Sequence, residues 1–192
     1  MELVEAQDYI LEVLGSSPTG DITSSNPDAQ AARAALKRIS KSVQKTGWWF
    51  NTDHNVIMEP APVSKEILLP VNVLKIVPYG SDNQKVVQRG IKLYDSINNS
   101  YQFDRNITAA RILNLDWDLL PYDVQETVQF SAASELCSTD LEDSIKAAEQ
   151  RDLATAALLE VRKTHLKVSK KNALTSPAAA RFRSRIRPYR RY

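Results

Sequence analysis

The chain of 192 residues has few of the residue types on which catalytic, metal and covalent sites depend. Its single cysteine, Cys137, excludes an internal disulfide. Its two histidines, His54 and His165, lie on different predicted elements, and with one cysteine they give no zinc-binding spacing. Only five glycines are present, and none forms a glycine-rich phosphate loop. We therefore expect no metal, no cofactor and no enzyme activity.

Long hydrophobic runs are missing as well. No apolar stretch approaches the roughly 18 to 20 residues that a membrane-spanning helix needs. The first residues, MELVEAQDYILEVL, carry acidic side chains and not the basic ones of a signal peptide. These features predict a soluble protein that stays in a reducing compartment.

Acidic residues are absent from one end of the chain. Residues 161–192 contain eleven Lys and Arg and no Asp or Glu, although the net charge of the whole chain is only +2. Residues 1–160 contain the other 14 of the 25 basic residues and all 23 acidic residues, so that part has a net charge of −9. An acidic body with a basic tail indicates a charged partner for the tail.

The clearest helical pattern runs over residues 26–47. Asn26 is a favoured N-cap, and Pro27 fits the first helical position, where its missing N–H costs nothing. Leu36, Ile39 and Val43 fall on one face, which predicts the buried side. Lysines and Arg33 recur every four residues on another face.

Three aromatic residues follow this helix at once. Gly47 predicts the end of the helix, and Trp48, Trp49 and Phe50 come directly after it. Three adjacent aromatic rings need partners to bury them. We interpret Gly47 to Phe50 as a structural joint between a helical part and the region that follows.

The region of about residues 49–115 has β-type patterning. The expected strands include one bent strand or two strands over residues 86–97, with Gly90 at the bend. Asn98 and Asn99 predict a turn to a further strand at residues 101–104. The remaining expected strands cover residues 51–59, 71–79 and 107–115.

Helical patterning also covers residues 2–15 and returns after residue 118. Asp118 is a possible cap and Pro121 fits a first turn, so one helix is expected over residues 119–138. Its predicted inner face consists of Val124, Val128, Ala132 and Leu136.

A further helix is expected over residues 139–168. Thr139 begins a sequence typical of a capping box. The residues expected on its buried side are Leu141, Ile145, Ala148 and Leu159.

Together these patterns predict an α+β fold. An antiparallel-type bundle of three to four helices carries an inserted small β-rich region and an extended C-terminal tail. We expect residues 1–168 to form a single domain and residues 169–192 to form a basic extension.

The basic extension is the main candidate binding segment. In an extended chain, alternate residues project to opposite sides, so arginines would line one side of residues 181–187. That ribbon can bind an acidic protein groove or a phosphate backbone, whereas a solvated, disordered tail is the alternative. Interleaved apolar and aromatic residues favour binding over pure solvation. The candidate residues are Arg181, Phe182, Arg183, Arg185, Ile186, Arg187, Tyr189, Arg190, Arg191 and Tyr192.

Two acids around a tryptophan give one enzymatic alternative. Asp116 and Asp118 flank Trp117, and a pair of carboxylates beside an aromatic ring can hydrolyse a glycoside. Side chains two residues apart do not converge on a helix, however. A helix start with a packed tryptophan is the simpler interpretation, and a polysaccharide hydrolase ranks last among the functions considered.

Several short motifs occur in an order that resembles a known family. K-x-G-W-x-F-N covers residues 45–51, R-G-x-x-x-Y-D covers residues 89–95, and F-D follows at residues 103–104. I-L-x-L-x-x-x-x-L-P then covers residues 112–121, before an alanine-rich helical end. Over roughly residues 4–160 the chain resembles the tail tubular protein A family of short-tailed bacteriophages, the head–tail adaptors or gatekeepers.

The resemblance implies a structural virion protein in the tail, assembled in the host cytoplasm. It implies a dodecameric ring beneath the portal protein, a platform for the nozzle protein, nearby tail fibre proteins and a channel for genomic DNA. No membrane contact is implied in the resting particle. Trp48 and Phe50 match the family motif, and Trp49 stands at a variable position. The C-terminal tail is expected to anchor on the portal, with nucleic-acid binding by the tail as the alternative function.

Overall fold

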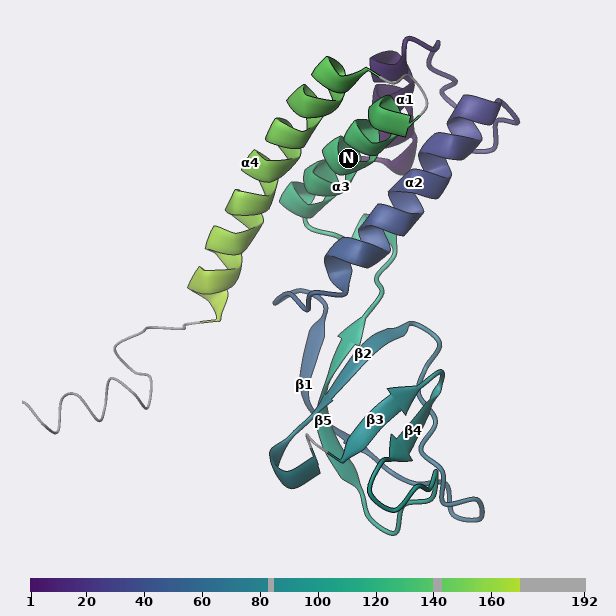
Figure 1. Cartoon of the computed structure of the whole chain (residues 1–192), viewed down its shortest axis with the longest axis vertical. Coiled ribbons are helices and arrows are strands. Elements are labelled where there is room, and N and C mark those ends of the chain that lie inside the picture. Colours follow the sequence, from purple (N-terminus) through teal and green to yellow (C-terminus); the bar gives the residue numbers. More distant parts are fainter. Residues whose placement is uncertain (83–84, 140–142, 170–192) are drawn as a thin grey trace, which may run out of the picture.

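The computed structural model describes residues 1–82, 85–139 and 143–169. The chain folds into a helical part and a separate β-rich part (Figure 1). The α-helices are α1 (Leu3–Leu14), α2 (Pro27–Gln44), α3 (Tyr122–Thr139) and α4 (Ser144–Val168). The strands are β1 (Thr52–Met58), β2 (Val73–Pro78), β3 (Val86–Arg89), β4 (Lys92–Asp95) and β5 (Ile107–Leu113). Short 3₁₀ turns cover Gly80–Asp82 and Trp117–Leu119. The expected α+β class is therefore confirmed.

The start of α2 follows directly from its sequence. The side chain of Asn26 accepts a hydrogen bond from the N–H of Asp28 at 2.9 Å, and Pro27 is the first helical residue. The N-cap oxygen thereby satisfies one of the free N–H groups of the first turn. Alanines dominate the buried side, which lets α2 approach its neighbours closely.

The helix α3 lies at the centre of the helical part, in contact with α1, α2 and α4. Its predicted inner face is confirmed, because Val124, Val128, Ala132 and Leu136 are all buried. Asp118 is not the cap of this helix, since a 3₁₀ turn over Trp117–Leu119 intervenes. Pro121 precedes the helix, and its carbonyl oxygen accepts bonds from the N–H groups of residues 124 and 125.

The predicted start of the last helix is wrong. Thr139 is the final residue of α3, and its hydroxyl donates to the carbonyl of Glu135 at 3.0 Å. Asp143 caps α4 instead, accepting from the N–H groups of residues 145 and 146. Aspartate and threonine are both favoured N-cap residues, so the sequence near residues 139–143 offers two possible starts for this helix.

The predicted buried side of α4 is also wrong. Ile145 is 73% exposed and Leu159 48% exposed, and Ala148 is exposed too. Leu141, the fourth residue of that set, lies outside the described residues. The side that faces α3 carries Ala147, Gln150, Ala154 and Val161. Small side chains on this side allow the close packing of α3 and α4, so α4 has apolar residues on two opposite sides.

The β-rich part contains a three-stranded antiparallel sheet in the order β1-β5-β2 and a β3–β4 hairpin. Gly90, with φ of +60°, lies in the turn of the hairpin, so the alternative of two strands is the correct one. Residues 101–104 form no strand, and Gln102 is the one residue among them that makes an isolated bridge, to Glu66. A bulge at Asn55, where φ is +57°, shifts the register between β1 and β5.

Each part has its own hydrophobic cluster. The helical cluster contains Ile10, Leu36, Val124 and Val128 and extends to Trp48. The β-rich cluster is built from the following residues: Met58, Ile67, Leu69, Val73, Ile76, Val86, Leu93, Phe103, Ile107 and Ala109. Two chain segments link the parts, one after α2 and one after β5 (Figure 1). The geometry of these two links fixes how the β-rich part is held on the helices.

Candidate functional site

Two buried amide side chains fasten the links between the helical and β-rich parts. The side chain of Gln44, at the end of α2, donates to the carbonyl of Leu115 at 3.0 Å and accepts from its N–H at 2.8 Å. Asn51 donates to the carbonyls of Gln44 at 2.9 Å and Leu113 at 2.8 Å. Gln44 is fully buried and Asn51 is 2% exposed. We call these two side chains the amide clamp.

The aromatic joint, Gly47 to Phe50, lies between the two residues of the clamp. The N–H of Trp48 donates to the side chain of Asn51 at 2.8 Å, and its indole N–H donates to the carbonyl of Val43 at 2.8 Å. Trp48 is 6% exposed and belongs to the helical cluster. Trp49 and Phe50 are half-buried and pack edge to face, with ring centroids 5.2 Å apart.

Gly47 is required at its position for two reasons. Its φ of +82° lies in the left-handed region that favours glycine. A Cβ added there would lie 2.7 Å from Cδ1 of Ile112 on β5. The helix therefore ends where the chain turns tightly against the sheet.

A cavity of about 470 Å³ lies beside the joint and brings the two histidines together. His54 comes from β1 and His165 from the last turns of α4, and the ring of His165 packs edge to face on Trp48 at 5.6 Å. Nδ1 of His54 lies 3.0 Å from the hydroxyl of Tyr79. Sequence reasoning did not foresee this proximity. Within the described part of the chain, no group of three or more His, Cys, Asp or Glu is placed to hold a metal ion.

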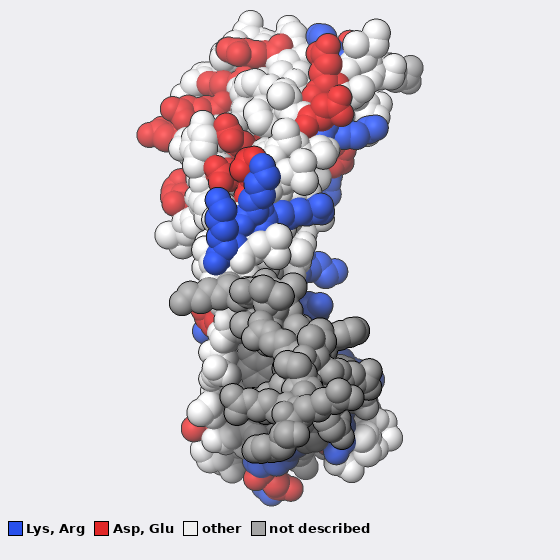
Figure 2. Space-filling view, turned by 90° about the vertical axis from the view of Figure 1, so that its left-hand side faces the viewer, with Lys and Arg blue, Asp and Glu red and all other residues white. Residues whose placement is uncertain are grey.

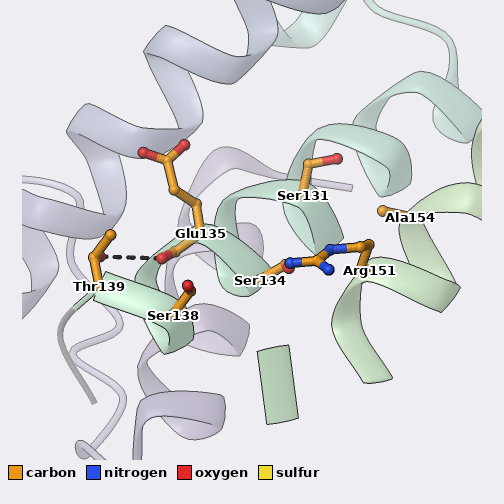
Figure 3. A pocket seen from close by; sticks show the side chains of 7 residues that line it. All are labelled: Ser131, Ser134, Glu135, Ser138, Thr139, Arg151 and Ala154. Carbon is orange, nitrogen blue, oxygen red and sulfur yellow. Dashed lines mark hydrogen bonds between the residues drawn. The ribbon is translucent and has the colours of Figure 1, made fainter. Parts of the chain in front are cut away.

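A second cavity, of about 370 Å³, opens between α3 and α4 (Figure 3). Three serines of α3 and Arg151 of α4 contribute to its wall. The hydroxyl of Ser134 donates to the carbonyl of Ala147 at 2.8 Å, which ties the two helices together. The Glu135 carboxylate points toward α2, where Arg38 pairs with it. Ser134 and Glu135 of this cavity thus fasten α3 to its neighbouring helices.

The structure does not bring the two candidate hydrolase carboxylates into one cavity. Asp116 lines a hollow of about 330 Å³ beside α2, whereas Asp118 is exposed and lines none of the described cavities. The indole N–H of Trp117 donates to the carbonyl of Met1 at 3.0 Å. Trp117 therefore fastens the N-terminus and packs on the helical cluster, which confirms the packed tryptophan of the simpler interpretation. The capping part of that interpretation is wrong for Asp116, whose side chain makes no cap hydrogen bond.

An ion pair organises the loops at the far end of the β-rich part. Arg105 donates two hydrogen bonds to the carboxylate of Asp82, one of them at 2.8 Å. These bonds hold the pKa of the Asp82 carboxyl below its usual range. Asp82 is 6% exposed, so its charge depends on this partner.

Charge is unevenly distributed over the helical part. Figure 2 shows acidic side chains gathered over its upper region and basic side chains below them, toward the β-rich part. Arg162, Lys163 and Lys167, near the end of α4, are all exposed. The ten candidate binding residues of the tail, between Arg181 and Tyr192, lie outside the described residues.

In the described ranges, no helix is both long and apolar enough to cross a membrane. A family model described as tail tubular protein matches residues 4–181. The chain is 31% identical over 188 residues to "Tail tubular protein A" of Klebsiella phage KP34, which covers 97% of each protein. A match of this length shows that the chain belongs to the tail tubular protein family.

Proposed function

We propose that the chain is a ring-forming adaptor that connects the portal protein to the tail nozzle and extends the channel through which DNA leaves the capsid. In this proposal twelve copies form the ring, by resemblance, and tail fibre proteins attach near its junction with the nozzle. The C-terminal tail anchors the ring to the portal.

Family membership carries the proposal. As a member of the tail tubular protein family, the chain is a structural component of the virion tail. The similarity to the KP34 protein extends over 97% of both chains, so it includes the helical part, the aromatic joint and the β-rich part together. A sequence similarity of this extent supports a shared role in assembly.

The β-rich part carries the exposed apolar groups that an assembly surface needs. Val63 is 96% exposed, Val71 91%, Leu68 59% and Ile91 53%. Leu68 and Ile91 lie on adjoining segments, because the N–H of Leu69 donates to the carbonyl of Ile91 at 2.8 Å. Neighbouring exposed apolar side chains mark interaction sites on soluble proteins. We assign these loops to contacts with other tail proteins.

The charge of the body suits a channel wall. Residues 1–160 carry a net charge of −9. A ring of such copies repels the phosphate backbone, so that DNA slides through without adhering. In such a channel, binding of the basic tail to the portal is favoured over binding to the DNA.

The test of anchoring removes residues 176–192 from the full chain. The truncated protein is expected to bind isolated portal more weakly than the full chain. A matched variant changes Arg181, Arg183, Arg185 and Arg187 to Gln, which keeps the length and the apolar residues of the tail. Portal binding that is unchanged by both alterations would remove the anchoring role.

Nucleic-acid binding by the tail is the second candidate function. It is favoured by Arg162 and Lys167, which form no ion pair among the described residues and continue the basic charge of the tail onto α4. A protein that grips phosphates binds DNA with an affinity that falls steeply as salt rises. A flat or absent response in a salt titration excludes this function.

A further inference from the structure

The outward side of α4 carries a regular apolar line that no other described part of the chain covers. Ile145, Asp152, Leu159 and Leu166 recur every seven residues, and all four are exposed. The exposed fractions of the three apolar members are 73%, 48% and 58%. A seven-residue repeat keeps side chains on one line along a helix. Ala148 and Ala156, exposed beside this line, leave room for a close approach.

The inward side of the same helix has a repeat of the same length. Ala147, Ala154 and Val161 are buried against the rest of the helical part. The exposed line lies on the opposite side of α4 from these three residues. A helix that is apolar on two opposite sides is typical of one buried between two layers, and the described ranges of the chain supply only one of these layers.

A hollow elsewhere on the monomer has the complementary chemistry. It measures about 330 Å³, and Leu3, Leu36, Leu115 and Trp117 form its apolar wall. Arg33 and Lys37 of α2 also line it. Neither α3 nor α4 contributes a residue, so the hollow and the apolar line of α4 belong to different surfaces. In Figure 1, α2 and α4 flank α3 on either side and both run toward the β-rich part.

The charges at the two surfaces are complementary as well. Asp152 is the one acid on the apolar line, and it takes part in no ion pair among the described residues. Lys37 at the hollow is likewise exposed and forms no such pair. A carboxylate that becomes buried in an interface needs a basic partner. Lys37 is the basic side chain of the hollow that is available for such a pair, because Arg33 already donates to the side chain of Gln7 and the carbonyl of Ser24. Asp116 also lines the hollow, so the position of Asp152 must lie nearer to Lys37 than to this acid.

We infer that the exposed line of α4 packs into the α2 hollow of a second copy of this chain, with Leu159 as its anchor and Asp152 paired with Lys37. This contact joins two different surfaces, so one copy of a pair retains a free hollow and the other retains a free α4 line. Such head-to-tail contacts generate rings when the rotation closes. The inference rests on the proposed ring and assigns its contact surface to named residues.

The size of the helix is adequate for this role. Its 25 residues span roughly 37 Å at 1.5 Å per residue. A strip roughly 10 Å wide along that length covers several hundred Å², which is the size of a functional apolar patch. Contacts from α2 and the N-terminal residues around the hollow add to this area.

The first experiment compares two leucines of the same helix. Leu159→Asp places a charge on the apolar line, whereas Leu153→Asp places one on a leucine of similar exposure, 44%, off that line. Self-association of the purified full-length chain is measured by sedimentation over a range of concentrations. We expect Leu159→Asp to weaken association at least about tenfold, as loss of a central anchor does. Leu153→Asp should change it little, and circular dichroism confirms that both variants are folded.

The second experiment identifies the surface that receives α4. Leu159→Cys and Lys37→Cys are combined in one chain and treated with a short bismaleimide, while the native Cys137 is buried. The double variant should give a ladder of cross-linked multimers, and each single variant should remain monomeric on a denaturing gel. Dimers from Leu159→Cys alone would show α4 paired with α4 and would overturn the inference. So would a wild-type chain that stays monomeric at every concentration.

The two proposals fail in distinguishable ways. A ring seen on the portal without cross-linking of the double variant refutes the α4 contact and leaves the adaptor function standing. Cross-linked multimers that never assemble on the portal refute the adaptor function and leave the contact standing.

Discussion

Replacing Asn51 by Ala tests whether the amide clamp fixes the β-rich part on the helices. The substitution removes three hydrogen bonds of 2.8 to 2.9 Å from a side chain that is 2% exposed. The carbonyl of Gln44 keeps a second partner, the N–H of Gly47 at 3.1 Å. The N–H of Trp48 loses its side-chain acceptor.

The expected cost follows from these partners. Two lost hydrogen bonds contribute about 0.5 to 1.5 kcal/mol each, and a buried N–H left without an acceptor costs about 1 to 3 kcal/mol. The free energy of unfolding should therefore fall by about 2 to 6 kcal/mol, a large share of the 5 to 15 kcal/mol typical of a domain. For a chain of this length, the midpoint of thermal unfolding should fall by about 4 to 24 °C.

Thermal and urea unfolding, followed by circular dichroism, measure the effect. Asn72→Ala is the matched control, because Asn72 is exposed in the loop before β2. Amide hydrogen exchange of Asn51→Ala should show the largest loss of protection around the two links. A change in the unfolding free energy below about 1 kcal/mol, or one equal to that of the control, would refute the role assigned to the clamp.

Three further predictions concern single residues. Gly47→Ala should lower the free energy of unfolding, measured in urea, by about 2 kcal/mol or more, because φ is +82° and the added Cβ meets β5. Gly90→Ala, where φ is +60° and the added Cβ meets open space, should lower it by about 1 kcal/mol. Equal losses would contradict the steric argument. Arg105 lowers the pKa of Asp82, so the stability that this pair contributes is present above about pH 4 and lost as the pH falls through the folded-state pKa. Asp82→Asn should thus be less stable than the wild type at pH 7 and approach it below pH 4; a pH-independent difference would contradict this. Cys137 is fully buried and burial raises the pKa of its thiol, so a thiol reagent should label it only as the chain unfolds, and rapid labelling of the native chain would contradict its burial.

Local signals were sufficient at one helix start and along one repeated set of apolar residues. Asn26 and Pro27 predicted the start of α2, and the four-residue repeat from Val124 predicted the inner face of α3. Strand positions in the β-rich region followed from β-branched residues bounded by turn signals. In each case the information lies within a few residues of the feature.

Sequence patterns failed at α4 for a physical reason. Ala147, Ala154 and Val161 compete with Ile145 and Leu159 for the role of buried face, and the larger residues gave the stronger signal. When a helix has two apolar sides, the spacing of its apolar residues does not show which side is buried within the monomer. If the α4 contact is correct, the second side is buried only in the assembly.

The joint was recognised from its aromatic residues, but its hydrogen-bonding residues were not. Gln44 and Asn51 find their partners 71 and 62 residues away along the chain. The proximity of His54 and His165 also depends on residues far apart in the sequence, because the last turns of α4 pack beside the joint. Polar side chains give no periodic signal for such distant partners.

Negative-stain electron microscopy of the full-length chain mixed with isolated portal tests the adaptor function most directly. The proposed function predicts a ring of copies stacked coaxially on the portal, with a central opening that continues the portal channel. Single copies scattered on the portal surface, or portal particles with no added layer under conditions where the chain is folded, would contradict it.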